Sequence, residues 1–119
     1  MRISPGVTSA DCIFCRIVAG RLGDGPVLST EDAVVIKDIA PQAPHHFLVV
    51  SREHVTSLND AAPRLLAGLL EAAQVLARRQ GFALDGYRVV INVLEQGGQT
   101  VPHLHVHVLA GRFMTWPPG

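Results

Sequence analysis

The segment 103–109 reads HLHVHVL, and its strict alternation of histidine with aliphatic residues decides the interpretation of this chain. In a β-strand, successive side chains point to opposite faces of the sheet. His103, His105 and His107 would therefore share one face, about 6.5–7 Å apart along the strand. Three explanations are open for such a face: histidines that simply meet solvent, a metal-binding cluster, or a site that handles phosphate.

The loop before this segment favours phosphate. Gly97 and Gly98 allow backbone conformations in which successive N–H groups point toward one anion, and Gln99 and Thr100 add side-chain donors. A neutral imidazole, whose usual pKa is about 6.5, is a good nucleophile at neutral pH. Two glycines alone would also suit a hairpin turn, but beside the histidines they indicate a site for a phosphoryl group.

The longest helix is expected at 63–80, where apolar residues recur at helical spacing. Pro63 suits its first turn and Gly81 its end, and Asn59 or Asp60 lies close enough to cap it. A shorter helix is expected nearer the N-terminus.

This shorter helix is expected to run from a cap at Asp11 to about Gly20.

Runs rich in β-branched residues predict four strands, at 33–38, 46–51, 87–93 and 103–109. The resulting order, α-β-β-α-β-β, indicates an α+β domain with a mainly antiparallel sheet and two helices. We expect residues 1–10 to be a disordered N-terminal tail and 11–119 to be a single domain.

The composition excludes several classes of protein. With 119 residues, 48% of them hydrophobic, the chain has the length of one domain and enough apolar material for a packed core. Ten basic residues balance ten acidic ones, which argues against nucleic acid or a membrane surface as a partner. No apolar run approaches the roughly 20 residues that cross a membrane. Residues 1–11 lack the apolar stretch of a signal peptide, so we expect a cytoplasmic protein.

Cys12 and Cys15 form a C-x-x-C pair, for which three explanations compete. A thioredoxin-like redox pair normally follows a strand, and no strand is predicted before this pair. Two unrelated core cysteines are the second explanation. The third is a zinc site, in which two histidines would complete the four ligands that a structural zinc ion requires.

Three runs of sequence resemble the histidine-triad family. The run GQTVPHLHVHVLAGRFMTWPPG carries its His-x-His-x-His pattern and is most similar to the Hint branch of purine nucleoside phosphoramidases, whose tails end in a similar Trp-Pro-Pro-Gly. The runs DIAPQAPHHFLVVSREHV and CIFCRIVAG extend the resemblance over roughly residues 11–119. It implies a single histidine-triad nucleotide-binding domain with the fold of that family.

The resemblance assigns roles residue by residue. His105 matches the nucleophile that attacks the α-phosphorus and forms a nucleotidyl-histidine, and His107 matches a partner that contacts phosphate. Asp38 matches a carboxylate that binds both ribose hydroxyls, and His46 matches a buried histidine behind the triad. The phosphate-binding positions are matched by Asn92, Gly98, Gln99, Thr100 and Val101, with Thr100 also in the catalytic group. The apolar slot for the base is matched by Ile13, Phe14, Ile17, Ile36 and Ile39.

The resemblance also bears on the cysteine pair. In histidine-triad proteins that carry such a pair, the zinc ligands resemble Cys12, Cys15, His54 and His103, which implies a structural zinc ion here. It implies no organic cofactor. His45 has no assigned role and is expected to be exposed.

The activity implied by the resemblance is cleavage of the P–N bond of purine nucleoside 5′-phosphoramidates, such as AMP joined to an amine, through a nucleotidyl-histidine. Two alternatives stay open: a dinucleoside polyphosphate hydrolase or phosphorylase of the same family, and a nucleotide-binding interaction module with little turnover. A zinc hydrolase with all three triad histidines as ligands is a more distant alternative. We also expect a homodimer with sheets joined across the interface and the Trp116 tail near the partner's site, because a small sheet leaves an edge to protect.

Overall fold

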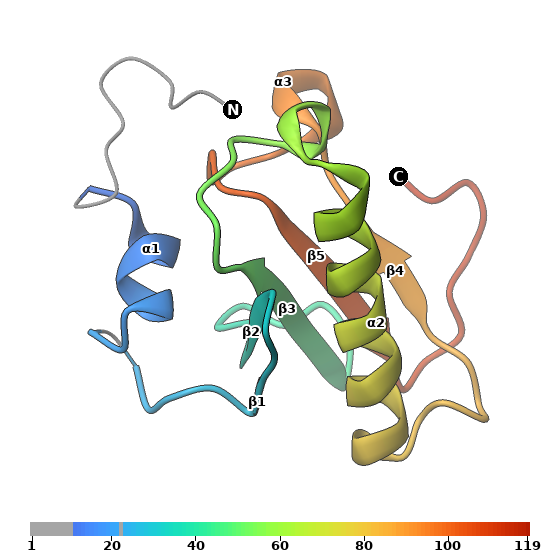
Figure 1. Cartoon of the computed structure of the whole chain (residues 1–119). Coiled ribbons are helices and arrows are strands. Elements are labelled where there is room, and N and C mark those ends of the chain that lie inside the picture. Colours follow the sequence, from blue (N-terminus) through green and yellow to red (C-terminus); the bar gives the residue numbers. More distant parts are fainter. Residues whose placement is uncertain (1–10, 22) are drawn as a thin grey trace.

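The computed structural model describes residues 11–21 and 23–119 of the chain. The disordered tail expected at residues 1–10 lies outside the described residues. The described part is an α+β domain, as the sequence predicts, with one antiparallel sheet and few helices (Figure 1). Its elements follow in this order: α1 (Ile13–Val18), β1 (Leu28–Ser29), β2 (Ala33–Lys37), β3 (His45–Ser51), the 3-10 turn η1 (Leu58–Asp60), α2 (Pro63–Gln80), β4 (Arg88–Val90), α3 (Leu94–Gly97) and β5 (His105–Ala110).

The sheet has five strands in the order β1-β2-β3-β5-β4, and every neighbouring pair is antiparallel. The histidine-bearing strand β5 lies inside the sheet, with β3 on one side and β4 on the other. Val50 of β3 lies opposite His105, and Leu48 lies opposite His107. Residues directly opposite each other on antiparallel strands share a face, so two aliphatic side chains flank these two histidines.

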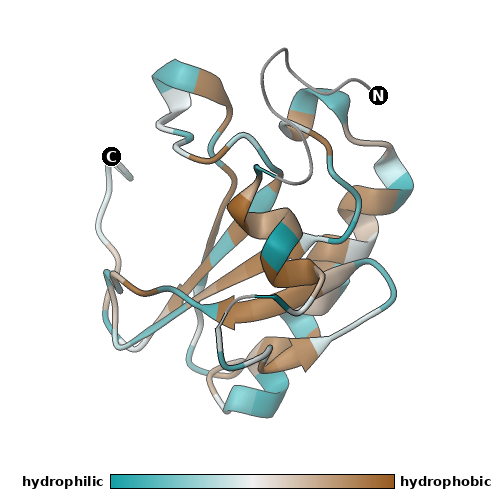
Figure 2. Cartoon of the chain, turned by 90° about the vertical axis from the view of Figure 1, so that its left-hand side faces the viewer, coloured by the Kyte–Doolittle hydropathy of each residue, from teal (hydrophilic) through white to brown (hydrophobic). Residues whose placement is uncertain are grey.

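The helix α2 covers the other face of the sheet. Its buried leucines and alanines form the main core with alternate residues of the strands, among them Val35, Val49, Val106 and Val108. Figure 2 shows how strongly apolar residues are concentrated along the strands. The bounds of α2 are those that the sequence predicts. Within the described residues, even this helix lacks the apolar length of a membrane-spanning segment.

The short helix α1 packs on the histidine-bearing face. Cys12 and Phe14 form a second, smaller core there with Leu48 and Val50. Figure 1 shows α1 at the side of the sheet, apart from α2. The two helices therefore cover opposite faces, and the histidines lie on the side of α1.

The helix caps differ from the prediction. Cys12, not Asp11, caps α1, because the sulfur of Cys12 accepts a hydrogen bond from the backbone N–H three residues later. The helix α2 has no side-chain cap: Asn59 and Asp60 belong to η1, and Ala62 stands at the cap position. The proline that begins α2 has no N–H, so one of the donors that a cap would satisfy is absent.

The strands also differ in detail. The strand expected at 87–93 is only β4, because the chain then leaves β5 to form α3. That short helix includes Gly97, which the sequence predicts to lie in the loop before the triad. The strand β1 was not predicted, since two residues are too short for an alternation pattern. The strand β5 begins at His105, because the N–H of His103 turns back to the carbonyl of Val101 at 2.8 Å.

Candidate functional site

The buried imidazole of His105 lies at the start of β5 on the face that α1 covers. Its Nδ1 lies 2.7 Å from the carbonyl oxygen of His103. A carbonyl oxygen can only accept, so Nδ1 donates its hydrogen and Nε2 presents a lone pair. Phe14 of α1 lies edge-on to this ring, with the two ring centroids 4.9 Å apart. The backbone thus fixes the tautomer of His105 that leaves Nε2 as a nucleophilic atom.

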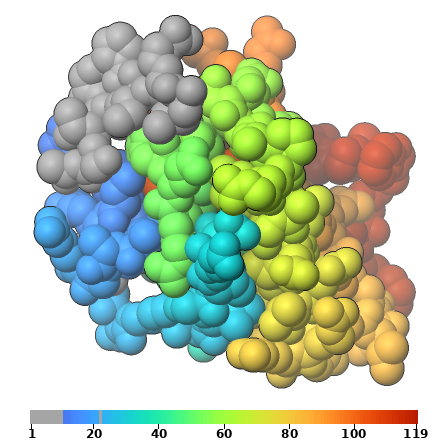
Figure 3. Space-filling model, in the orientation of Figure 1, coloured from blue at the N-terminus to red at the C-terminus, as the bar shows by residue number. Residues whose placement is uncertain are grey.

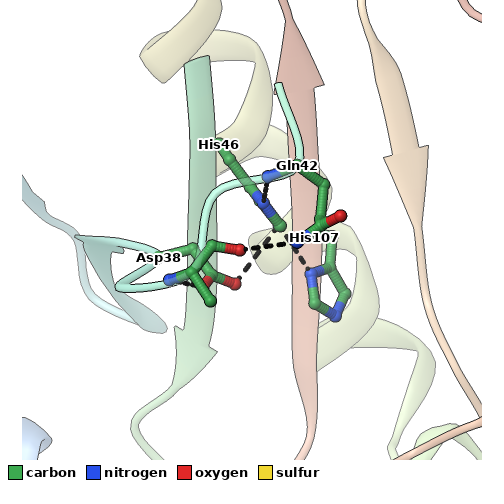
Figure 4. A network of polar contacts seen from close by, with 5 residues as sticks. Asp38, Gln42, His46 and His107 are labelled. Atoms are coloured by element: carbon green, nitrogen blue, oxygen red, sulfur yellow. Dashed lines mark hydrogen bonds and ion pairs between the residues drawn. The ribbon is translucent and has the colours of Figure 1, made fainter. Parts of the chain in front are cut away.

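His107 belongs to a polar network with His46 and Asp38 (Figure 4). Nδ1 of His46 accepts the backbone N–H of Gln42 at 3.0 Å, so the hydrogen of the neutral His46 ring is on Nε2. This Nε2 lies 3.0 Å from Nδ1 of His107 and 3.3 Å from Oδ2 of Asp38. Nδ1 of His107 is therefore an acceptor, and its Nε2 carries the hydrogen. His107 presents a donor where His105 presents a lone pair.

These two rings are neighbours and both are kept neutral by burial. Their centroids lie 5.2 Å apart. Desolvation lowers the pKa of His105, and the carbonyl of His103 and the charge of Asp38 oppose this only in part. Desolvation, then the neighbouring His105 and His46, lower the pKa of His107. Since the usual pKa of histidine is about 6.5, both imidazoles are neutral at pH 7.

An apolar pocket of about 500 Å³ lies beside α1. Four residues expected in the base slot line it: Ile13, Ile17, Ile36 and Ile39. Phe14, the fifth expected residue, is buried in the smaller core against His105. A pocket of this size with mainly apolar walls is typical of small-molecule sites.

Asp38 follows β2 directly and is only partly buried. Its Oδ1 accepts the N–H of Ala40 at 2.8 Å, while Oδ2 faces His46. An ionised carboxylate has about four acceptor positions, so further hydroxyl donors can bind to it. Because its neighbours Ile36 and Ile39 line the apolar pocket, this carboxylate lies between the pocket and the histidines.

Gln99 shapes the loop that precedes the triad. Its Oε1 accepts the N–H of Leu94 at 2.9 Å, and its Nε2 donates to the carbonyl oxygens of Thr56 and Val101. Both side-chain hydrogens of Gln99 thus bond backbone carbonyls, whereas the sequence predicts them as donors for phosphate. Gly98 has a φ of +80°, a conformation that favours glycine.

The other residues expected at phosphate surround this loop. Thr100 is exposed and lines a second hollow of about 520 Å³ together with Gly98 and Pro102. Asn92 is half-buried ahead of α3, and Val101 packs against the smaller core. Gly98, Thr100 and Pro102 thus share one hollow in the loop that precedes β5 in the chain.

The first histidine of the triad, His103, belongs to a second cluster. The ligand atoms of Cys12, Cys15, His54 and His103 lie within 4.8 Å of one another. Sγ of Cys12 is 3.3 Å from Nδ1 of His103, and Sγ of Cys15 is 3.1 Å from Nδ1 of His54. In Figure 3, the blue segment of α1 lies next to the green segment that follows β3 and carries His54. The four residues expected as zinc ligands are thus brought together.

The tautomer of His103 fits a metal ligand. Its Nε2 lies 2.7 Å from the carbonyl oxygen of Ser51, so Nε2 carries the hydrogen and Nδ1 presents a lone pair to the cluster. Burial lowers the pKa of His103 to about 4, so Nδ1 stays unprotonated at neutral pH. Nδ1 of His54 lies 3.1 Å away. Two sulfurs and two ring nitrogens at one point form a donor set that suits zinc.

Sequence reasoning missed the backbone groups of the site. The carbonyls of His103 and Ser51 and the N–H of Gln42 fix three tautomers, and such groups leave no signal in a sequence. His45, expected to be exposed, is half-buried and its ring stacks on Phe47 with centroids 6.5 Å apart. The reason is the alternation along β3, which directs His45 to the side of α2 and His46 to the network.

Comparisons with known proteins agree with this geometry. A family model described as HIT domain matches residues 24–114. The chain is 38% identical to the adenylylsulfatase HINT1 of Arabidopsis thaliana, over 90% of this chain and 76% of that protein. It is 42% identical to a 14 kDa zinc-binding protein of Zea mays, over 90% of this chain and 87% of that protein. The crystal structure of a HIT family hydrolase from Legionella pneumophila Philadelphia 1 superposes with a TM-score of 0.86 at 42% identity, covering 91% and 99% of the two chains.

Proposed function

Since this chain belongs to the HIT domain family, we propose that it is a nucleotide hydrolase that cleaves the P–N bond of purine nucleoside 5′-phosphoramidates. Similarity to a HIT family hydrolase and to an adenylylsulfatase supports hydrolysis of a nucleotide substrate. The observation that carries the proposal of a nucleotidyl-histidine is the pair of opposite tautomers: a lone pair on Nε2 of His105 beside an N–H on Nε2 of His107. The choice of the P–N bond rests on the resemblance to phosphoramidases.

The first step is attack on phosphorus. The lone pair of His105 Nε2 forms a bond to the α-phosphorus, and the P–N bond to the amine breaks with its electron pair on nitrogen, which takes a proton from solvent water. A neutral ring is required, and burial supplies it by lowering the pKa of His105. Water then attacks the nucleotidyl-histidine, releases the nucleoside monophosphate and restores the free ring. Two displacements replace one difficult step.

The phosphate oxygens need donors as negative charge grows on them. The N–H of His107 is one, because His46 occupies its other nitrogen. Thr100 and the loop that begins at Gly98 would supply the others, and Gln99 would hold that loop in shape. Preorganised donors of this kind act on the transition state without reorganising. We assign the catalytic roles to His105, His107 and Thr100.

The nucleoside would extend from the histidines past Asp38 into the apolar pocket. The carboxylate of Asp38 would accept the two ribose hydroxyls with the acceptor positions that Ala40 and His46 leave available. The base would lie between the isoleucines of α1 and those around β2. Asn92 and Val101 complete the proposed phosphate side.

We further propose a structural zinc ion held by Cys12, Cys15, His54 and His103. Support comes from their convergence within 4.8 Å and from the similarity to a zinc-binding protein of Zea mays. When bound, such an ion supplies folding stability. The proposal includes no organic cofactor, no nucleic acid or membrane partner, and a cytoplasmic location, all of which rest on composition and resemblance.

A homodimer is the last part of the proposal. The strand β4 lies at an edge of the sheet, where it can pair with its counterpart in a second copy. The C-terminal tail lies near this edge, because the guanidinium of Arg88 in β4 donates a hydrogen bond to the carbonyl of Thr115 at 3.0 Å. Phe113 and Trp116 are 99% and 81% exposed in the single chain, and aromatic residues of this kind are favoured at interfaces.

A turnover assay tests the activity. AMP joined to a fluorescent amine is incubated with the purified chain, and release of AMP and amine is followed. Adenylyl sulfate is the second candidate substrate, because the Arabidopsis relative is named an adenylylsulfatase, and a dinucleoside polyphosphate is the third. We expect the highest kcat/KM for the phosphoramidate. Binding of AMP without turnover of any of the three would instead indicate an interaction module.

A further inference from the structure

We propose that Cys12 and Cys15 are positioning residues for nucleotide binding: with His54 and His103 they hold α1 where it forms one wall of the base pocket. This role rests on the proposed function, because it assigns the apolar pocket to the base of a nucleotide. It goes beyond a contribution to stability, since it predicts which part of the nucleotide loses affinity when the cluster is lost.

The helix α1 cannot hold its own position. It has six residues, whereas isolated helices shorter than about 12–15 residues are marginal in water. The chain after it contains Gly20, Gly23 and Gly25, all with positive φ and none with a neighbouring atom close to the position of an added Cβ. These glycines make no close contact that would fix the helix, so side-chain contacts place it: Phe14 packs in the smaller core, and the two cysteines join the cluster.

The cluster joins a fixed half to this helix. Its histidine half is anchored at the end of the sheet: Nε2 of His103 donates to the carbonyl of Ser51, the last residue of β3, at 2.7 Å, and the next residue, Leu104, donates to the carbonyl of Val55 at 2.8 Å. Its cysteine half belongs to α1, with Cys12 at the cap and Cys15 one turn later. The contacts within the cluster therefore link both ends of the first turn of α1 to the end of the sheet.

The pocket wall depends on the same turn. Ile13 follows Cys12, Ile17 comes two residues after Cys15, and both line the apolar pocket. Ile13 is 44% exposed and presents apolar surface to the pocket. Displacement of α1 would thus remove one wall of the pocket, while the wall formed by Ile36 stays on the sheet.

The ribose and phosphate side depends on α1 less: Phe14 packs on the His105 ring and Val101 on the smaller core, but the groups that would bind ribose and phosphate come mainly from the sheet. Asp38, His46 and His107 come from β2, β3 and β5, and their network contains no residue of α1. The tautomer of His105 is set by the backbone of His103, which the sheet holds. Loss of the cluster should therefore weaken binding of the base and spare binding of the ribose and phosphate.

The test compares two probes on two proteins. The double variant Cys12→Ser, Cys15→Ser removes the thiols but keeps a hydroxyl that can cap α1. Dissociation constants are measured by calorimetry for AMP and for ribose 5-phosphate, which lacks the base. We expect AMP to bind at least about tenfold more weakly to the variant than to the zinc-loaded wild type, and ribose 5-phosphate to change by less than about twofold.

Leu76→Ala supplies the matched control, because Leu76 is a buried residue of α2 in the main core and does not belong to the smaller core. This variant should have a lower free energy of unfolding, but its affinity for AMP should not fall relative to its affinity for ribose 5-phosphate. If the double variant does not fold by circular dichroism, wild type stripped with a chelator and then reloaded with zinc is measured with the same probes.

Equal weakening of both probes, or unchanged AMP binding without the cluster, would overturn the positioning role while leaving the proposed function intact. Failure of the wild type to bind AMP would overturn the proposed function and the positioning role together. A base-dependent loss that zinc reverses would support both.

Discussion

The carbonyl oxygen of His103 accepts the Nδ1–H of His105 at 2.7 Å, while Nδ1 of the same His103 lies 3.3 Å from the sulfur of Cys12. One residue thus borders two sites. Its backbone sets the tautomer of the proposed nucleophile, and its ring belongs to the cysteine–histidine cluster. Because the sheet holds this backbone, the two sites can be disturbed separately by mutation.

Removal of the His105 ring should abolish the chemistry and spare binding. In His105→Ala, kcat for an AMP-amine substrate is expected to fall at least about 1,000-fold, or about 4 kcal/mol in activation free energy. AMP should still bind, because Asp38, His107 and the loop remain. His45→Ala is the matched control, since His45 packs on the side of α2. A His105→Ala variant with more than about a tenth of wild-type kcat would exclude His105 as the nucleophile.

His46 and His107 should act as one unit. In His46→Phe, Nδ1 of His107 loses its donor, so the ring can turn its lone pair toward the phosphate. We expect kcat/KM to fall about 10- to 100-fold, less than the loss on removing a whole donor group. Combining His46→Phe with His107→Ala should cost no more than His107→Ala alone. Additive losses in this double-mutant cycle would show that His46 does not act through His107.

The pH profile should reflect the burial of the triad. Burial lowers the pKa of His105 and of His107 below the ordinary histidine value of about 6.5. The neutral ring is the nucleophile, so activity is fully present at pH 7 and is lost only as pH falls through the lowered pKa values. We expect the acid limb of kcat/KM to have its midpoint below pH 6.5. An acid limb with its midpoint at or above pH 6.5 would contradict this assignment.

Zinc analysis tests the cysteine–histidine cluster. Protein purified under reducing conditions should contain about one zinc ion per chain, and Cys12→Ser, Cys15→Ser should contain almost none. Stripping the metal should lower the melting temperature by at least about 5 °C, because a structural ion stabilises the folded chain. Zinc well below one per chain that added metal does not restore would argue against the site.

The sequence predicted those features that side-chain patterns record. The alternation around His105 and His107 placed both rings on one face, and the apolar spacing of α2 gave its bounds. The resemblance brought together the pocket isoleucines and the four cluster residues, which the structure indeed gathers.

Features set by the backbone could not be predicted in this way. Gln99 bonds three backbone groups and so shapes the loop, although its amide looked like a donor for phosphate. His103 precedes β5 and serves two sites through its ring and its carbonyl, which alternation alone does not indicate. The side of the sheet that His45 faces follows from the register of β3, and register depends on contacts distant in the sequence.

The tail should influence the leaving group through a second copy of the chain. Deletion of residues 113–119, which removes the exposed Trp116, is expected to change the relative kcat/KM values of different amine leaving groups. AMP affinity should stay nearly constant, because no residue of this segment lines the pocket. Light scattering at micromolar concentration gives the oligomeric state. A monomer whose amine preference survives the deletion would contradict both the dimer and the role of the tail.

Intact-protein mass spectrometry tests the covalent intermediate most directly. The chain is mixed with an AMP-amine substrate, quenched within the first turnover in alkaline denaturant to preserve a phosphorus–nitrogen bond, and then fragmented. The account predicts a transient mass increase of one adenylyl group that maps to His105 and is absent from His105→Ala. Turnover without any adduct in the wild type, or an adduct on a different residue, would contradict it.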